Sequence, residues 1–288
     1  MALRNPAAEV VAITVVAGNV PLDKAVQNAL YTVELSGSDV PVYSGVAGPL
    51  LRELETAQFV HGEDGMSDIG LPLQGRRPES GHAVDVIIET AQRHAGRLTL
   101  VTLGPLTNLA VALLRAPEIA SMIERCVVMG GIGSGHGNVT PVAEYNIWVD
   151  PEAASIVFRS GLPITMVGWD ISRISAVIDP GTARRLRGID TELARFAIDI
   201  QGTLAEFTAS VTKLDGFDLP DPIAMAVALD PSIAATRRTH VEVVVGDGPG
   251  RGQTIVDHLP REGRPANVEV VTAVPAELFL TQLETALR

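Results

Sequence analysis

Short apolar runs rich in β-branched residues alternate with longer segments of mixed polarity along most of the chain. Such runs suit strands that are buried on both faces of a parallel sheet, and the mixed segments suit helices that connect one strand to the next. The pattern therefore predicts an α/β fold with an open, mainly parallel sheet flanked by helices. The predicted strands cover residues 10–16, 40–43, 98–103, 126–129, 164–167, 241–245 and 268–271, with a hairpin-like polar stretch around residues 246–250.

Helix signals lie between the predicted strands. Asp150-Pro151-Glu152 is typical of a helix start, because Asp caps the first turn, Pro fits the first helical position and an acid interacts well with the helix dipole. From Thr191 to Thr212, apolar residues recur every three or four positions, which predicts one long amphipathic helix. The other predicted helices cover residues 22–35, 83–93, 109–115, 151–160, 221–229 and a segment from residue 275 onward, and residues 1–6 resemble the last turn of a helix.

Length and composition indicate that the chain forms one domain and in which cellular compartment the protein acts. A chain of 288 residues, of which 46% are hydrophobic, can bury a large core, and no internal repeat or linker divides residues 1–288. The one cysteine, Cys126, excludes an internal disulfide and lies in an apolar run, where a thiol is usually an inert core residue. No apolar run reaches the roughly 20 residues of a membrane span. The first residues show no charged-then-apolar leader, so we expect a cytoplasmic protein.

The net charge limits the partners. A formal charge of -12 gives the surface a field that repels polyanions, so a nucleic acid polymer is a poor partner, whereas a small neutral ligand is compatible. Three common enzyme patterns are also absent from the sequence: G-x-G-x-x-G, Walker A and G-x-S-x-G. Their absence argues against a dinucleotide site, a phosphate loop and a serine hydrolase.

Polar residues in four loops that follow apolar strands carry the candidate chemistry, since a doubly wound sheet binds ligands at the carboxyl ends of its strands. Asn138, Glu144 and Asn146 bring two amides and a carboxylate together after a glycine-rich turn, and such a set can hold the vicinal hydroxyls of a ribose. The alternative is that Asn138 and Glu144 only cap and shape a surface turn. The four loops cover residues 16–19, 60–65, 129–146 and 219–222.

Four more candidates each have a purely structural alternative. Asn19 ends the first apolar run and is either a turn residue or a ligand contact. His61 could donate a proton or a hydrogen bond, because histidine titrates near neutrality, or be an exposed loop histidine. Asp221 precedes Pro222, and the local pattern favours a helix cap. Met129 follows an apolar strand, where methionine is more often a core residue than a ligand contact.

Six sequence segments, spread over nearly the whole chain, match one family pattern in order and spacing. They are V-V-A-G-N at 15–19, V-H-G-E-D-G at 60–65, L-G-P-L-T-N at 103–108, V-M-G-G at 128–131, G-N-V-T-P-V-A-E-Y-N at 137–146 and V-D-P-E-A at 149–153. Together they resemble the inosine/uridine-preferring nucleoside hydrolase family. The resemblance implies a Rossmann-like fold and calcium-assisted hydrolysis of the N-glycosidic bond of ribonucleosides to ribose and free base. It also implies a nucleoside or ribose as small-molecule partner and a homodimer or homotetramer.

The resemblance also implies roles for single residues. Water would attack the anomeric carbon, with calcium and an aspartate preparing that water. Calcium would be bound by the backbone carbonyl of Leu103 and the carboxylate of Asp221. Ribose would be held by four polar side chains and its pocket lined by one methionine, namely Asn19, Asn138, Glu144, Asn146 and Met129.

Two departures from the family pattern change the expectation. The D-x-D-x-x-x-D-D segment, which supplies the base and further calcium ligands, is expected upstream of Met1 and is not among the 288 residues. We therefore expect a truncated start, a missing first strand with unpaired backbone on its neighbours, poor calcium affinity and impaired activity. Pro220 stands where many members carry a histidine, so His61, His240 or solvent would protonate the leaving base.

Two other hypotheses stay open. The chain could be a non-catalytic ribose- or nucleoside-binding protein that has lost the metal site, or a fragment that does not fold independently. The preference for purine or pyrimidine bases also stays open, because the resemblance implies that base contacts come from variable loops and from the segment 191–213.

Overall fold

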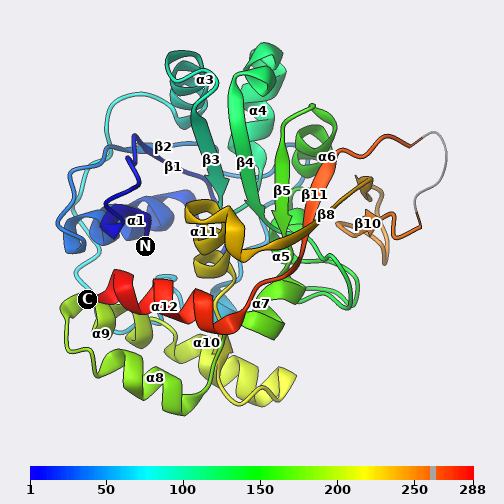
Figure 1. Cartoon of the computed structure of the whole chain (residues 1–288). Coiled ribbons are helices and arrows are strands. Elements are labelled where there is room, and N and C mark those ends of the chain that lie inside the picture. Colours follow the sequence, from blue (N-terminus) through cyan, green and yellow to red (C-terminus); the bar gives the residue numbers. More distant parts are fainter. Residues whose placement is uncertain (260–263) are drawn as a thin grey trace.

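The computed structural model, which describes residues 1–259 and 264–288, has a five-stranded sheet at its centre (Figure 1). The first four strands in the sheet order are parallel, and the fifth is an antiparallel edge strand. The order is β3 (Leu98–Thr102), β4 (Ile123–Met129), β5 (Ile164–Val167), β11 (Val268–Ala273) and β8 (Ala235–Thr239). The prediction of an open, mainly parallel sheet with flanking helices is confirmed.

Both faces of this sheet are buried, which explains the continuous apolar runs. Side chains alternate across a strand, so Cys126 and Val128 of β4 face one core and Val127 and Met129 face the other. The first core packs against α3 (Ala83–Arg93), α4 (Thr107–Arg115) and α6 (Pro151–Arg159). The second packs against α7 (Trp169–Ser175), α11 (Pro220–Leu229) and α12 (Ala276–Leu287).

A second parallel pair, β1 (Ile13–Val15) with β2 (Val42–Ser44), packs against α1 (Leu22–Leu35) and forms a sheet of its own. A cleft of about 70 Å³ lies between this pair and β3, lined by Thr14 and Val16 on one side and by residues 100–103 on the other. Neither β1 nor β3 has a second partner strand among the described residues. Each therefore has one edge without a partner strand in the described part of the chain.

The predicted long helix over residues 191–212 is wrong. The segment forms α9 (Glu192–Asp199), α10 (Gly202–Phe207) and a π-helical turn at Thr208–Thr212. Ser67, from a distant loop, enters the break: its hydroxyl donates to the carbonyl of Ile200 at 2.7 Å and accepts the backbone N–H of Thr203 at 3.1 Å. A contact from another part of the chain therefore replaces helical hydrogen bonds that the local pattern predicts.

The remaining elements are short. The predicted strand 241–245 contains β9 (Val241–Val243), which pairs in a hairpin with β10 (Thr254–Val256), a strand that the sequence pattern missed. Residues 1–6 contain only one 3₁₀ turn, Ala2–Arg4. No described helix is long and apolar enough to cross a membrane. The other short elements are α2 (Gln58–His61), α5 (Tyr145–Val149), β6 (Val177–Ile178), α8 (Pro180–Arg187), β7 (Phe217–Asp218), β9 (Val241–Val243) and β10 (Thr254–Val256), with 3₁₀ turns at Pro117–Ser121 and Pro231–Ile233.

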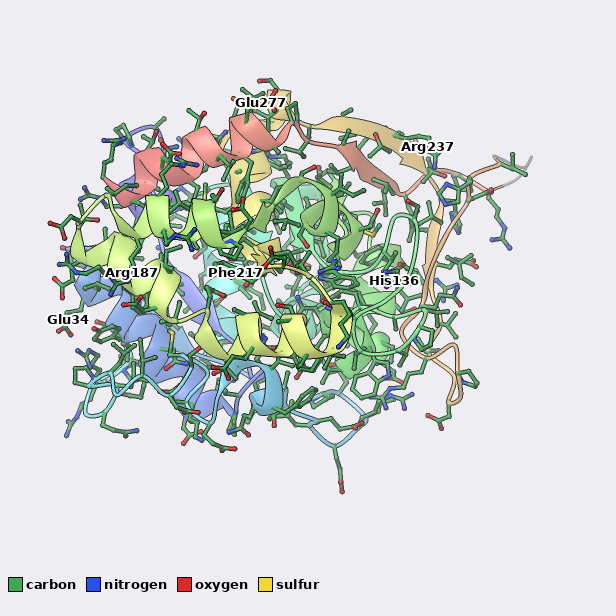
Figure 2. All side chains as sticks on the ribbon, turned by 90° about the horizontal axis from the view of Figure 1, so that it is seen from below. Glu34, His136, Arg187, Phe217, Arg237 and Glu277 are labelled. Carbon is green, nitrogen blue, oxygen red and sulfur yellow. The ribbon has the colours of Figure 1, made fainter. Side chains whose placement is uncertain are left out.

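The carboxyl ends of the parallel strands point toward α7 and α10, as the arrowheads in Figure 1 show. Figure 2 views the molecule from below: Phe217 of β7 lies near the centre of this view, and His136, in the loop after β4, lies to one side of it. The fold therefore brings the loops after β4 and β5, and the segment before α11, to one end of the sheet.

Candidate functional site

Glu144 lies at the centre of the candidate site. Its carboxylate caps α5 by accepting the backbone N–H groups of Asn146 (2.9 Å) and Ile147 (3.3 Å). It also accepts the backbone N–H of Gly131 at 2.9 Å. Only 2% of Glu144 is exposed, and this burial raises its pKa to about 7, although the three hydrogen bonds act to lower it. Glu144 is therefore a buried acid that changes protonation near neutral pH.

Asn146 and Met129 form the next part of the site. Nδ2 of Asn146 donates to the carbonyl of Met129 at 3.2 Å and lies 3.2 Å from its sulfur. Both residues are buried, Met129 at the end of β4 and Asn146 in the first turn of α5. Within the described ranges, Oδ1 of Asn146 accepts no hydrogen bond. This oxygen is thus available to a ligand hydroxyl.

Asn138 also holds the start of α5. Its Oδ1 accepts the backbone N–H of Tyr145 at 2.9 Å, and the residue itself is exposed. The structural alternative for Asn138 and Glu144 is confirmed in part, because both side chains cap the turn. It is wrong for Glu144 in one respect, since this carboxyl is buried rather than on the surface.

Asp221 lies in the first turn of α11. The helix begins at Pro220 and the capping residue is Leu219, so the predicted helix-cap role of Asp221 is wrong. Burial raises the pKa of Asp221 to about 7, and repulsion from Glu144 adds to the effect. The two carboxyl groups are therefore close enough to interact electrostatically. No described group donates a hydrogen bond to Asp221, so its charged form lacks the support that Glu144 has.

Asn19 is connected to the start of α5 by hydrogen bonds to the short segment 55–57. Its backbone carbonyl accepts the N–H of Ala57 at 3.0 Å. Two residues earlier, the carbonyl of Glu55 accepts the hydroxyl of Tyr145 at 2.8 Å. The side chain of Asn19 is exposed at the end of β1. Residues 55–57 therefore connect the end of β1 to the start of α5.

The oxygen donors suit calcium in kind but not in number. Leu103 follows β3 beside the cleft, next to Thr102, whose buried hydroxyl has no hydrogen-bond partner among the described residues. With the carboxylate of Asp221 they offer a carbonyl, a hydroxyl and a carboxylate. Calcium binds 6–8 oxygen ligands. The part of the chain that the structure describes contains no group of three or more His, Cys, Asp or Glu side chains that could hold a metal ion. These three oxygens are therefore fewer than a complete calcium shell needs.

His61 does not support the predicted role as a proton donor. It ends α2, and burial lowers its pKa to about 4. The imidazole is therefore neutral at pH 7, where it can donate a hydrogen bond through one ring nitrogen but carries no extra proton. The alternative of an exposed loop histidine is also wrong, because His61 is partly buried.

The L-G-P-L-T-N segment has a structural role that the sequence did not assign. The hydroxyl of Thr107 donates to Asp150 at 2.6 Å, and Asp150 caps α6 and accepts the backbone N–H of Leu50. Asn108 donates to the carbonyl of Val15 and accepts the N–H of Val46, both at 2.9 Å. The sequence feature that could have revealed this role is a polar Thr-Asn pair at the start of an otherwise apolar helix.

The comparisons with known proteins agree with each other. The family described as "Inosine-uridine preferring nucleoside hydrolase" matches residues 1–281. The chain is similar to the pyrimidine-specific ribonucleoside hydrolase RihB of Shigella flexneri serotype 5b, with 36% identity over 100% of this chain and 91% of that protein. RihB of Escherichia coli K12 gives the same identity and coverage.

Two solved structures share the fold over most of their length. The plant nucleoside hydrolase PpNRh1 has a TM-score of 0.93 and 33% identity, covering 99% of this chain and 92% of that chain. A purine-preferring ribonucleoside hydrolase from Gardnerella vaginalis has a TM-score of 0.91 and 35% identity, with the same coverage. The relatives' names thus include both pyrimidine-specific and purine-preferring enzymes.

Proposed function

The chain belongs to the inosine-uridine preferring nucleoside hydrolase family, and from this premise we propose that it hydrolyses the N-glycosidic bond of ribonucleosides to ribose and free base. The observation that carries the proposal is the buried polar group formed by Glu144, Asn146 and Met129 beside Asp221. An apolar core excludes such groups unless they are paired or functional. Here Asp221 has no described donor, which favours a functional site over a structural one.

Ribose binding follows from the hydrogen-bonding capacity that remains. Oδ1 of Asn146 can accept a hydroxyl hydrogen, and Nδ2 of Asn138 can donate because only its Oδ1 is occupied. Oε2 of Glu144 already accepts two backbone N–H groups, whereas Oε1 accepts one and keeps a further lone pair. A site that pairs with hydroxyls in this way discriminates against a sugar that lacks one, because a buried polar group is then left unpaired.

The chemical step depends on charge. Hydrolysis passes through an oxocarbenium-like sugar, and buried carboxylates stabilise positive charge where water is excluded. Glu144 and Asp221 supply that negative charge above pH 7. Asp221, with no described donor, is also the carboxylate that can accept a proton from the attacking water.

Calcium remains a proposal from the family resemblance. Asp221 and the carbonyl of Leu103 would be its protein donors, and calcium would supply Lewis-acid activation of water when bound. Because these donors are too few for a calcium shell, we expect weak affinity, and no step above depends on the metal.

An aromatic pair offers a surface for the base. Phe59 of α2 and Phe207 of α10 lie edge to face with ring centres 5.8 Å apart, and Phe59 is 70% exposed. Phe59 is two residues from Ala57, which is hydrogen-bonded to Asn19. We propose that a purine or pyrimidine ring stacks here, because aromatic rings bind either base by its face.

A non-catalytic ribose- or nucleoside-binding protein is the second candidate. It is favoured by one observation, that no group of three acidic or histidine ligands exists among the residues that the structure describes. We further propose that the protein acts in the cytoplasm as a homodimer or homotetramer on small nucleosides, and sedimentation analysis would give its oligomeric state.

Incubation with inosine, uridine and 2′-deoxyinosine tests the function. We expect free base and ribose from the first two, little from the deoxynucleoside, and loss of activity in Asn146→Ala. Arg115→Ala, which removes an exposed ion pair with Asp85, is the surface control. Calorimetry with and without calcium separates the two candidates: binding without base release supports the binding protein, and absence of both contradicts each of them.

A further inference from the structure

The loop between β9 and β10 contacts several walls of the ribose site. We propose that this hairpin segment, residues 244–254, is a positioning element of the site and that Arg251 is its main positioning residue. The inference rests on the proposed function, because it concerns what holds the ribose-binding groups in place. Arg251 contacts neither Glu144 nor Asn146 by any described hydrogen bond, so its effect would pass through other residues.

Arg251 fixes the helix that carries the site's polar groups. Its guanidinium lies 4.0 Å from the ring centre of Trp148, and its Nε donates to the Trp148 carbonyl at 3.1 Å. Trp148 belongs to the five-residue helix α5, which Glu144 caps at its start. A helix of that length is unstable alone, and a cation at its last carbonyls is favourable. Arg251 therefore holds the end of α5 opposite Glu144.

The backbone of the hairpin lies directly against the same helix. Gly252 has φ +75°, and a Cβ at this position would lie 2.4 Å from Cα of Trp148. Next in the hairpin, the hydroxyl of Thr254 accepts the N–H of Ile132 at 2.8 Å and donates to its carbonyl at 2.9 Å. Ile132 follows Gly131, whose N–H binds Glu144. The hairpin thus contacts both backbone segments that donate to Glu144.

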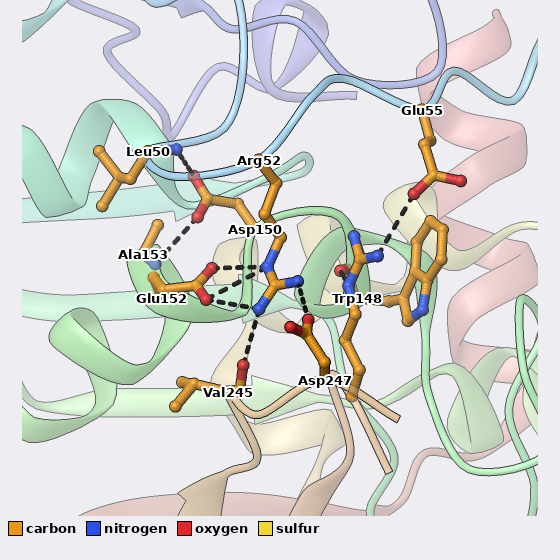
Figure 3. Close-up of polar contacts among 10 residues, drawn as sticks. Leu50, Arg52, Glu55, Trp148, Asp150, Glu152, Ala153, Val245 and Asp247 are labelled. Atoms are coloured by element: carbon orange, nitrogen blue, oxygen red, sulfur yellow. Dashed lines mark hydrogen bonds and ion pairs between the residues drawn. The ribbon is translucent and has the colours of Figure 1, made fainter. Parts of the chain in front are cut away.

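A second arginine joins the hairpin to the segment that leads to Asn19. Arg52 binds both oxygens of Glu152 at 2.7–3.2 Å, and its other contacts are Asp247 at 2.6 Å and the carbonyl of Val245 at 2.7 Å (Figure 3). Arg52 and Glu152 are less than one-fifth exposed, so this pair is better shielded than a surface ion pair.

Arg251 connects the hairpin to Glu55, which lies three residues after Arg52 in the same segment. Its Nη1 lies 3.3 Å from Oε1 of Glu55, whose carbonyl accepts the Tyr145 hydroxyl. The ribose-binding groups come from separate elements, and small displacements of such groups reduce binding strongly. The two arginines connect these elements through the hairpin.

Three variants test the role of Arg251 by D-ribose and inosine binding, at a temperature where melting curves show each to be folded. Arg251→Ala should weaken binding about tenfold. Arg251→Lys keeps a charge for Glu55 but loses the planar fork, so it should recover part of the affinity. Arg115→Ala loses one ion pair elsewhere and should stay within about twofold of the wild type.

Hydrogen exchange gives a second readout that needs no ligand. In Arg251→Ala, the amides of residues 145–149 should exchange about tenfold faster, and those of α12 should not change. Unchanged affinity, or unchanged exchange at 145–149, would overturn the proposal. If the wild type bound neither ribose nor inosine, the proposed function would fail, whereas the exchange data would still decide whether Arg251 positions α5.

Discussion

Glu144 is a buried acid and Asp221 is a partly buried one, and the two differ in how many hydrogen bonds they accept. Glu144 accepts three backbone hydrogen bonds, whereas Asp221 accepts none from any residue that the structure describes. Burial raises the pKa of each carboxyl group to about 7, and for Asp221 repulsion from Glu144 contributes to the rise. The charged form of Asp221 is the costlier one, since it is neither hydrogen-bonded nor separated from Glu144.

Asp221→Asn should reduce the loss of stability between pH 5 and pH 8. A carboxyl whose pKa rises from 3.8 to about 7 on folding stabilises the protein fully below pH 3.8, and this contribution is lost as the pH rises through 7. An amide has no such loss. The difference should be roughly 2 kcal/mol, measured by urea unfolding in EDTA at both pH values. An identical pH dependence in variant and wild type would contradict it.

Thr107→Val should lower the free energy of unfolding by roughly 1–3 kcal/mol. The change keeps the shape but removes the hydroxyl that donates to the buried Asp150, which then retains the N–H groups of Leu50 and Ala153. Urea unfolding measures the loss. Thr281→Val is the matched control, because this exposed hydroxyl bonds only to its own helix at Glu277, and a comparable loss there would contradict the argument.

At the scale of elements, the sequence pattern predicted those helices and strands whose bounds depend on residues close together in the chain. The predicted bounds 22–35, 83–93 and 164–167 agree with α1, α3 and β5, because periodicity and burial act within each segment. The break before α10 was missed, since it depends on Ser67. β8 was missed because its side chains are mostly exposed and include two arginines, which suit an edge strand rather than an apolar run.

The candidate site was predictable only in part for the same reason. The residues after the glycine-rich turn were found from their spacing, and the structure brings Asn138, Glu144 and Asn146 together at α5. The repulsion between Glu144 and Asp221, the orphaned hydroxyl of Thr102 and the low pKa of His61 are results of burial, which no short segment records.

Replacing either of two glycines by alanine should change the free energy of unfolding, in opposite directions at the two positions. Gly202→Ala, in the first turn of α10, should raise the free energy of unfolding by about 0.5–1 kcal/mol, because its Cβ would come no closer than 3.9 Å to another residue. Gly252→Ala should lower it, because its positive φ and the contact with Trp148 exclude a Cβ. Thermal melting compares them, and the same sign for both would contradict the prediction.

At the scale of the whole molecule, the division into two sheets predicts unequal stability. The core of β1, β2 and α1 contains few buried side chains, namely Val15, Val26, Val33 and Val42. No ladder of backbone hydrogen bonds joins it to the central sheet within the described residues. Hydrogen exchange should therefore be at least tenfold faster in β1 and β2 than in β4 and β5. Equal protection would mean that the two sheets unfold together.

Cys126 is fully buried in β4, and burial raises the pKa of its thiol to about 12. Only a thiolate reacts readily with alkylating reagents, so the native protein should resist them until the central sheet opens. The rate of iodoacetamide labelling then measures how often the protein unfolds globally. A cysteine introduced at Phe59 would be the single reactive thiol of the folded chain, to which a fluorophore can be attached without removing any natural residue elsewhere.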